Sequence, residues 1–195
     1  MSPKPHVLIM GHSFVRRFEL FLSKGVDARV RRDLHLSRSA QITFLVIGGR
    51  TVDKLSKFDL HLVRRLQPQI VILEIGSNDL FPPDARPEVV GSKIETLVQR
   101  LHAECQVETT VVCQTINRAA GLRDPPSFND RVALLNFTCS VIVPGRTFLR
   151  RLINLIVGVK RPRYFIRLNR ETKSDLQFMA YLFRIIQWQV FLFRL

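Results

Sequence analysis

Short, uniformly apolar runs that alternate with helix-like segments are the feature that most constrains the fold of this chain. Four such runs lie at residues 7–10, 42–47, 70–75 and 109–115. Strands that are apolar along their whole length need cover on both faces, and parallel sheets between layers of helices provide that cover. The pattern therefore predicts an α/β fold, a three-layer αβα sandwich built on a parallel sheet.

Between these runs, apolar side chains recur at the spacing of a helix, at residues 14–23, 52–66 and 88–105. A length of 195 residues suits one domain of ordinary size with an appendage. We place the α/β domain at residues 1–135, with its sheet incomplete at the C-terminal edge. Residues 136–195 are predicted to form a basic, apolar, helical tail.

The positive charge of the chain is concentrated in this tail. Lys and Arg outnumber Asp and Glu by 11 to 2 over residues 136–195, and by 19 to 14 before them. Counterion release would favour nucleic acid as a partner, and arginines around Tyr164 and Phe165 suit base stacking, although a solvated basic face is the commoner explanation. The apolar stretch at 176–195 contains Arg184, so a packed helix is expected there rather than a membrane span.

Three cysteines, Cys105, Cys113 and Cys139, show no short spacing of the kind that binds metals. They are predicted to be reduced, buried thiols of an intracellular protein. No metal or cofactor is expected. The apolar stretch at 6–10 is too short for the hydrophobic region of a secretory signal, which favours a cytoplasmic location. The oligomeric state is left open.

Small polar motifs follow three of the apolar runs. Gly-His-Ser ends at Ser13, Gly-Gly-Arg-Thr contains Gly49, and Gly-Ser-Asn-Asp contains Asn78. Each motif alone is commonly a tight turn or a helix cap. In a parallel sheet, however, the carboxyl ends of the strands share one edge, where ligands bind. The ordered set therefore indicates a site.

Taken in this order, the three motifs resemble those of the SGNH hydrolases, also called GDSL-type esterases, over about residues 6–135. The resemblance implies that Ser13 is the nucleophile of an acyl-ester hydrolysis. It also implies that the backbone N–H groups of Ser13 and Gly49 and the amide of Asn78 stabilise the oxyanion, each donor contributing on the order of 3 kcal/mol. A small ester would be the substrate. His12 stands where the family usually has Asp.

The family's last motif, an Asp-x-x-His that supplies the general base, has no counterpart in this sequence, and no histidine follows His102. Adjacent side chains at a strand-to-helix turn usually diverge, so His12 is not expected to serve Ser13. The remaining histidines have no reason to converge on the site: His6, His35, His61 and His102. Loss of the base costs roughly a millionfold in kcat. We therefore expect a domain truncated before that motif, with weak or no esterase activity, a pseudoenzyme.

Residues 134–180 carry a second resemblance, through Leu-Asn-Phe-Thr-Cys at 135–139, Pro-Gly-Arg-Thr at 144–147 and Ile-Arg-Leu-Asn at 166–169. They are similar to the region after the reverse transcriptase in tyrosine-recombinase retrotransposons. The segment has no Tyr-x-Asp-Asp and no acidic metal-binding cluster, so polymerase or nuclease activity is not implied. The alternative function is thus a retroelement-derived, non-enzymatic fusion or nucleic-acid-binding fragment.

An incomplete sheet would expose an edge strand and apolar surface, which proteins usually cover. Residues 139–143, Cys-Ser-Val-Ile-Val, have high β-propensity. We predict that they pair with the sheet or lie against it beside residues 109–115.

Overall fold

Strands and helices alternate along the chain, as the sequence predicts. The computed structural model describes residues 4–23, 40–115 and 127–142. Its elements, in chain order, are β1 (His6–Gly11), α1 (Ser13–Ser23), β2 (Gln41–Val46), α2 (Val52–Phe58), α3 (Leu60–Leu66), β3 (Ile70–Glu74), α4 (Pro87–Cys105), β4 (Thr109–Val112) and α5 (Phe128–Ile142). The α/β class is therefore confirmed.

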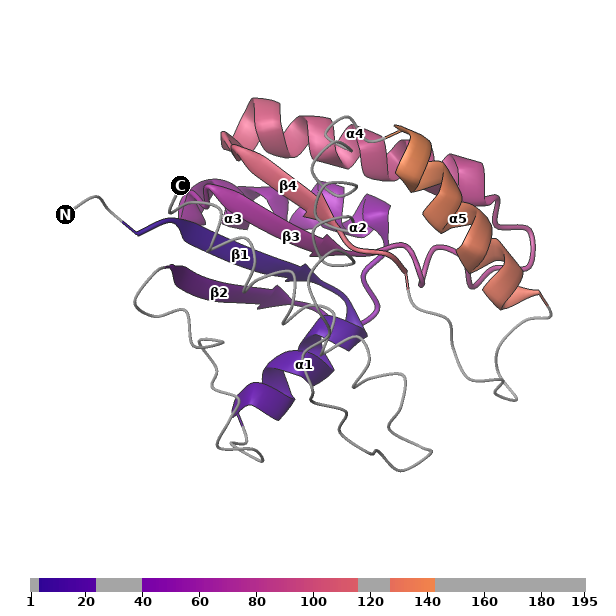
Figure 1. Ribbon diagram of the computed structural model, residues 1–195, viewed down its shortest axis with the longest axis horizontal. Coiled ribbons are helices and arrows are strands. Elements are labelled where there is room, and N and C mark those ends of the chain that lie inside the picture. Colours follow the sequence, from indigo (N-terminus) through magenta and orange to yellow (C-terminus); the bar gives the residue numbers. More distant parts are fainter. Residues whose placement is uncertain (1–3, 24–39, 116–126, 143–195) are drawn as a thin grey trace, which may run out of the picture.

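The described strands form one sheet in the order β2-β1-β3-β4, and every neighbouring pair is parallel. Helices α2 to α5 pack together on one face, while α1 lies on the other side, against β1 and β2 (Figure 1). The three-layer arrangement is confirmed. The last residue of β1, Gly11, pairs with Val46 of β2 and with Glu74 of β3, so three strands end at the same level.

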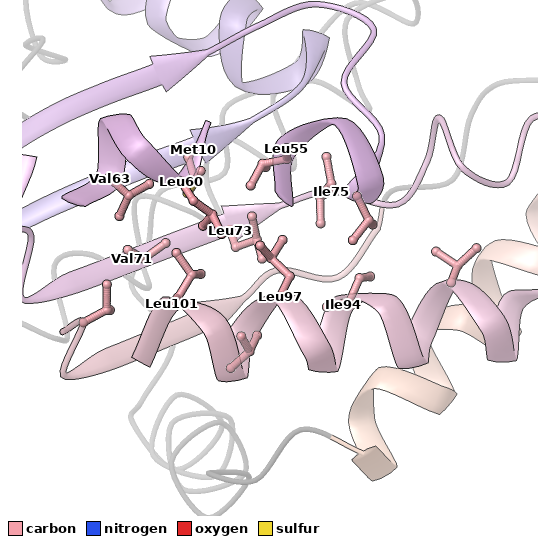
Figure 2. Close-up of a cluster of buried hydrophobic side chains, with 14 of the residues drawn as sticks. Met10, Leu55, Leu60, Val63, Val71, Leu73, Ile75, Ile94, Leu97 and Leu101 are labelled. Atoms are coloured by element: carbon pink, nitrogen blue, oxygen red, sulfur yellow. The ribbon is translucent and has the colours of Figure 1, made fainter. Parts of the chain in front are cut away.

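The main hydrophobic core lies between the sheet and α4 (Figure 2). Alternate side chains of the two central strands point into it, and α4 contributes one residue per turn. The principal members are Leu8, Met10, Val71, Leu73, Ile94, Leu97 and Leu101, all nearly inaccessible to solvent. Burial of each such side chain stabilises the fold by about 1.5–3 kcal/mol relative to exposure.

On the other face, α1 buries a stripe of its own. Phe14, Val15 and Phe18 are buried, and the ring of Phe18 meets that of Phe44 from β2 edge-on, with centroids 6.0 Å apart. Apolar residues three and four apart on a helix form such a stripe. The first helix thereby fixes the position of its own N-terminus at the end of β1.

The helix predicted over residues 52–66 is two helices, α2 and α3, with Asp59 between them. Asp59 has φ −112° and ψ −14°, and its backbone N–H donates to the carbonyl oxygen of Leu55 at the end of α2. Its buried carboxylate binds the guanidinium of Arg50. The apolar spacing continues across this break, which is why the sequence pattern does not reveal it.

Residues 139–142 do not pair with the sheet as a strand, so that form of the prediction for residues 139–143 is wrong; residue 143 lies outside the described residues. Residues up to Ile142 belong to α5, and the Cys139 side chain packs against the core. Phe128, Val132 and Leu135 bury one side of this helix, and helical packing overrides the local β-propensity. The helix also crosses the boundary predicted at residue 135.

Several predictions concern parts of the chain outside the described residues. They include the helical tail, the Tyr164–Phe165 segment and the stretch at 176–195. The division at residue 135 and the incomplete edge of the sheet also stay predictions. Among residues 4–23, 40–115 and 127–142, no helix is both long and apolar enough to cross a membrane, and no three potential metal ligands cluster.

The cysteines are free thiols, two of them buried and Cys139 half-buried. Burial raises the pKa of Cys113, and it raises that of Cys139 to about 11. A thiol with a raised pKa is a weak nucleophile near neutral pH. The burial of Cys105 and Cys113 agrees with the prediction of buried thiols, whereas Cys139 is only half-buried.

Candidate active site

Gly11 brings the ends of β1 and β3 into close contact. A Cβ at this position would lie 2.2 Å from the carbonyl oxygen of Glu74 and 2.8 Å from the side chain of Val15, so only glycine fits. On the other side, the carbonyl oxygen of Gly11 accepts a hydrogen bond from the backbone N–H of Ile47 (3.3 Å). The segments that follow β1, β2 and β3 therefore begin close together, where the three strand ends pack tightly.

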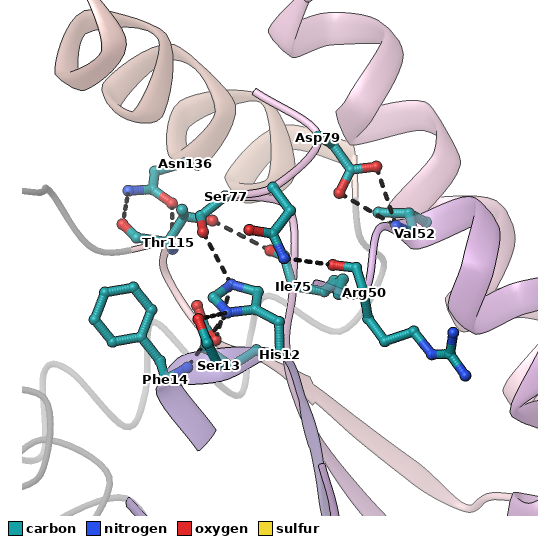
Figure 3. A network of polar contacts seen from close by, with 12 residues as sticks. His12, Ser13, Phe14, Arg50, Val52, Ile75, Ser77, Asp79, Thr115 and Asn136 are labelled. Carbon is teal, nitrogen blue, oxygen red and sulfur yellow. Dashed lines mark hydrogen bonds and ion pairs between the residues drawn. The ribbon is translucent and has the colours of Figure 1, made fainter. Parts of the chain in front are cut away.

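Ser13, the predicted nucleophile, is the first residue of α1 and is half-buried. Its Oγ lies 3.5 Å from Nδ1 of His12, and the backbone N–H of Phe14 is directed at the same nitrogen (3.4 Å) (Figure 3). The prediction that the two adjacent side chains diverge is wrong. A single residue, His12, connects strand to helix, and its ring folds back over the first turn of α1.

The His12 ring is completely buried between two partners from the end of β3. Its Nε2 lies 3.0 Å from Oγ of Ser77 and 3.2 Å from Oε2 of Glu74. Neither carboxylate oxygen of Glu74 forms a geometrically aligned hydrogen bond within the described part of the chain. The contact with His12 is therefore electrostatic. The sequence interpretation overlooked Glu74, although an acidic residue inside an apolar run is a signal that could have identified it.

Asn78, the predicted oxyanion donor, lies just beyond β3 and is half-buried. Its amide donates to the carbonyl oxygen of Arg50 (2.8 Å). An amide carries two hydrogens, so this bond orients the side chain and, within the described part of the chain, leaves one hydrogen to donate to a ligand. The Arg50 side chain forms a bidentate pair with Asp59, at 2.9 Å for both hydrogen bonds. The loop that holds Asn78 is thus anchored in turn.

Gly49 belongs to that same loop and is exposed to solvent. Its φ of 71° lies in the left-handed region, which glycine adopts without strain. Two residues later, Thr51 caps α2 by accepting the backbone N–H of Lys54 (3.3 Å). The backbone at Gly49 is therefore followed at once by an anchored arginine and the start of a helix.

Asp79, in the third motif, makes a second contact with the segment that follows the second motif. Both carboxylate oxygens accept the backbone N–H of Val52 at the start of α2 (3.0 and 3.2 Å). Burial raises the pKa of Asp79 to about 6, and the hydrogen bond from Val52 opposes the rise. Asp79 thus supports the start of the distant helix α2 rather than capping its own segment, whereas Asn78 binds the loop of Gly49.

Hydrogen bonds between their neighbours bring all three motifs to one edge of the sheet (Figure 3). His12, next to Ser13, contacts Ser77, next to Asn78. Asn78 in turn binds Arg50, next to Gly49. An attacking hydroxyl, an imidazole nitrogen and hydrogen-bond donors for a developing negative charge are the parts that acyl transfer needs.

The other described histidines lie away from this edge. The ring of His6 bonds the carbonyl oxygen of Leu66 and the hydroxyl of Thr43, at the opposite end of β1. His61 is exposed on α3, and His102 binds the carbonyl oxygen of Val107 after α4. These placements agree with the sequence interpretation; His35 lies outside the described residues.

Several solved structures share this fold. A candidate acylhydrolase from Bacteroides fragilis superposes with a TM-score of 0.59 at 18% identity, covering 96% of this chain and 89% of its own. The acetylxylan esterase of Geobacillus stearothermophilus gives 0.58 at 14% identity, with 95% and 96% covered. The acetyl xylan esterase AlAXEase gives 0.55 at 14% identity, with 93% and 98% covered. At such identities the likeness concerns the fold.

No match was found among curated proteins. None of these three structural relatives bears on the retroelement resemblance of residues 134–180. A family profile, in contrast, matches residues 11–139, about two thirds of the sequence, and this region includes Ser13, Gly49 and Asn78. The chain belongs to the GDSL-like lipase/acylhydrolase family.

Proposed function

We propose that this chain is a serine ester hydrolase that forms an acyl-enzyme on Ser13. The observation that carries the proposal is the pair of contacts linking the three motifs, from His12 to Ser77 and from Asn78 to Arg50. They support a site in which Ser13 attacks the ester carbonyl. The N–H groups of Ser13 and Gly49 and the second amide hydrogen of Asn78 would then stabilise the oxyanion.

The proposed rate is low. The sequence has no Asp-x-x-His and no histidine after His102, so the base that the family uses has no counterpart here. A serine hydroxyl is a poor nucleophile near pH 7 unless a base removes its proton. We therefore place the activity far below that of an esterase with a complete triad, by up to roughly a millionfold.

A short acyl ester is the substrate class to test first, in a protein that we propose is intracellular. Two structurally similar proteins are named acetyl xylan esterases, which supports an acetyl group as the acyl chain. Neither the leaving group nor longer acyl chains are indicated by the residues at the site. Acetylated xylooligosaccharides are therefore a second substrate after p-nitrophenyl acetate.

Hydrolysis of p-nitrophenyl acetate by the full chain and by Ser13→Ala tests the proposal. We expect a serine-dependent excess over the buffer rate that Ser13→Ala abolishes. Ser23→Ala is the matched control, because Ser23 lies exposed at the far end of the same helix and bonds only the carbonyl of Glu19 among described residues. Equal rates for the full chain and Ser13→Ala would overturn the proposal.

The competing proposal is a retroelement-derived, non-enzymatic fusion that binds nucleic acid. The excess of 11 basic over 2 acidic residues at 136–195 favours it. Retention of the full chain on immobilised single-stranded DNA, weakening steeply as salt rises, would support this function. Absence of retention at low salt would remove it.

A further inference from the structure

The neighbours of the His12 ring favour the tautomer that carries its proton on Nε2. The backbone N–H of Phe14 can only donate, and it points at Nδ1, so that nitrogen must offer its lone pair (3.4 Å). Nε2 faces two oxygens, Oγ of Ser77 and Oε2 of Glu74. With the proton on Nε2, the same Nδ1 lone pair can accept the hydroxyl proton of Ser13.

We propose that His12 is the general base of this chain, in place of the histidine that the family carries on its last motif. The inference rests on the proposed function and names the group that supports whatever activity Ser13 has. His12 is 0% exposed, and its Nδ1 approaches the Ser13 hydroxyl within 3.5 Å. Such contacts commonly shorten when substrate binds, so this separation is compatible with proton transfer.

Glu74 and Ser77 act as positioning residues. Both face Nε2 from the end of β3, which keeps the proton on that nitrogen and the lone pair on Nδ1. When the ring accepts a second proton, the carboxylate of Glu74 lies 3.2 Å from the new positive charge in a site with almost no solvent exposure. A buried charge is strongly stabilised by an opposite charge at this distance. Serine, imidazole and carboxylate thus occur in the order of a catalytic triad.

The proton and bond changes balance without any further reactant. The Ser13 hydroxyl proton moves to Nδ1 of His12 while Oγ bonds the ester carbonyl carbon, giving the oxyanion. The bond to the leaving alcohol oxygen then breaks, and that oxygen takes the proton from Nδ1. Water next loses a proton to Nδ1 as its oxygen attacks the acyl carbon. The bond from this carbon to Oγ breaks, Oγ regains the proton, and the carboxylic acid departs.

The arrangement also gives a physical reason for low activity. Nδ1 has a single lone pair, which the Phe14 N–H and the Ser13 hydroxyl share. A backbone hydrogen bond to this lone pair weakens it as a base. A base on a separate loop, as the family's last motif provides, has no such competitor.

The first test compares Ser13-dependent hydrolysis of p-nitrophenyl acetate in the full chain and in His12→Gln. We expect a loss of about a hundredfold, the lower end of what a general base contributes. His61→Gln is the control, since His61 is an exposed histidine on α3, and it should retain the rate. If the full chain shows Ser13-dependent turnover and His12→Gln equals it, His12 is not the base. No Ser13-dependent turnover in the full chain would instead overturn the proposed function.

A second measurement needs no variant at His12 and therefore survives a failure of His12→Gln to fold. Nitrogen NMR of the histidine-labelled full chain reports which ring nitrogen carries the proton. We expect Nε2 protonated and Nδ1 unprotonated, with the Nδ1 signal shifting after a fluorophosphonate modifies Ser13. A proton on Nδ1 in the unmodified protein, or no change in this signal on modification, would overturn the inference.

Discussion

The two halves of the candidate site are built in opposite ways. In the oxyanion half, formed by residues 48–51 with Asp59 and Asn78, the polar side chains meet well-aligned partners, as in the bidentate pair of Arg50 and Asp59. In the base half, formed by His12, Glu74 and Ser77, the buried carboxylate of Glu74 has an electrostatic contact with His12 but no aligned hydrogen bond among the described residues.

This difference indicates which half contributes to the stability of the fold. Aligned hydrogen bonds around a buried ion offset its desolvation, whereas an incompletely paired buried carboxylate lowers stability. The oxyanion half thus contributes to the stability of the folded protein. The base half lowers the free energy of unfolding, and destabilising arrangements of this kind are concentrated at functional sites. Variants that remove one carboxylate from either half should therefore differ in their effect on stability.

The largest effect is expected for Asp59→Ala in the oxyanion half. It removes the buried partner of the half-buried Arg50 and leaves that guanidinium without its bidentate acceptor, so the free energy of unfolding should fall by about 3 kcal/mol. Urea denaturation followed by circular dichroism measures it. Asp53→Ala is the control, because its exposed pair with Lys93 should matter little. Similar losses in both variants would mean that the oxyanion half is not anchored by Asp59.

Asn78→Ala should affect both catalysis and stability. Loss of one oxyanion donor lowers the Ser13-dependent rate by about a hundredfold, equivalent to roughly 2.7 kcal/mol. Loss of the hydrogen bond to Arg50 costs about 1 kcal/mol of stability.

Asn136→Ala is the matched control for that experiment. Asn136 forms two hydrogen bonds with the backbone of Thr115 and holds α5 to the end of β4. Its loss should lower stability without changing the rate per folded molecule. Equal rate losses in the two asparagine variants would assign the effect of Asn78 to structure rather than to an oxyanion.

The fold could be predicted from the sequence because its signals are local and repeated. Apolar runs such as residues 70–75 and the helical spacing at 88–105 each report burial directly, and both elements are present with ends shifted by one residue. The break at Asp59 could not be predicted, because it depends on Arg50, a partner that no local pattern identifies. Residues 139–142 similarly follow the packing of α5 and not their own β-propensity.

The positions of the site motifs could also be predicted, since the ends of parallel strands share an edge. The base half could not. Whether the His12 ring turns toward Ser13 depends on a one-residue connection, on Glu74 at the end of β3 and on Ser77 three residues beyond it. The rotamer of such a side chain is set by its tertiary neighbours, and local sequence patterns do not identify those neighbours.

Asp79, which follows Asn78 and bonds the first residue of α2, makes a pH-dependent contribution to stability. Its pKa is 3.8 in the unfolded reference and about 6 when folded, so between these values the folded protein binds the proton more tightly. Stability should therefore fall as pH rises from about 4 to above 6, by about 3 kcal/mol for this group. Urea denaturation of the full chain and of Asp79→Asn across this range isolates the difference.

Asparagine keeps an acceptor for the Val52 N–H at this position, so the variant should lose the pH-dependent decline and keep the helix cap. Asp84→Asn, at an exposed position, serves as the control and should follow the unmodified protein. Parallel stability curves for all three proteins would show that the Asp79 carboxyl does not titrate differently on folding.

Glu74→Gln is expected to have the smallest effect, but it discriminates best between the two halves. Its expected change in the free energy of unfolding is opposite in sign to that of Asp59→Ala. Removing the incompletely paired charge from the base half should leave the free energy of unfolding unchanged or raise it by about 1 kcal/mol. The Ser13-dependent kcat should nevertheless fall by about tenfold with KM unchanged, since a neutral amide stabilises the imidazolium of His12 less than a carboxylate does. Steady-state kinetics beside urea denaturation measure both. A loss of stability like that of Asp59→Ala would show that the fold requires both halves alike, and the contrast between them would disappear.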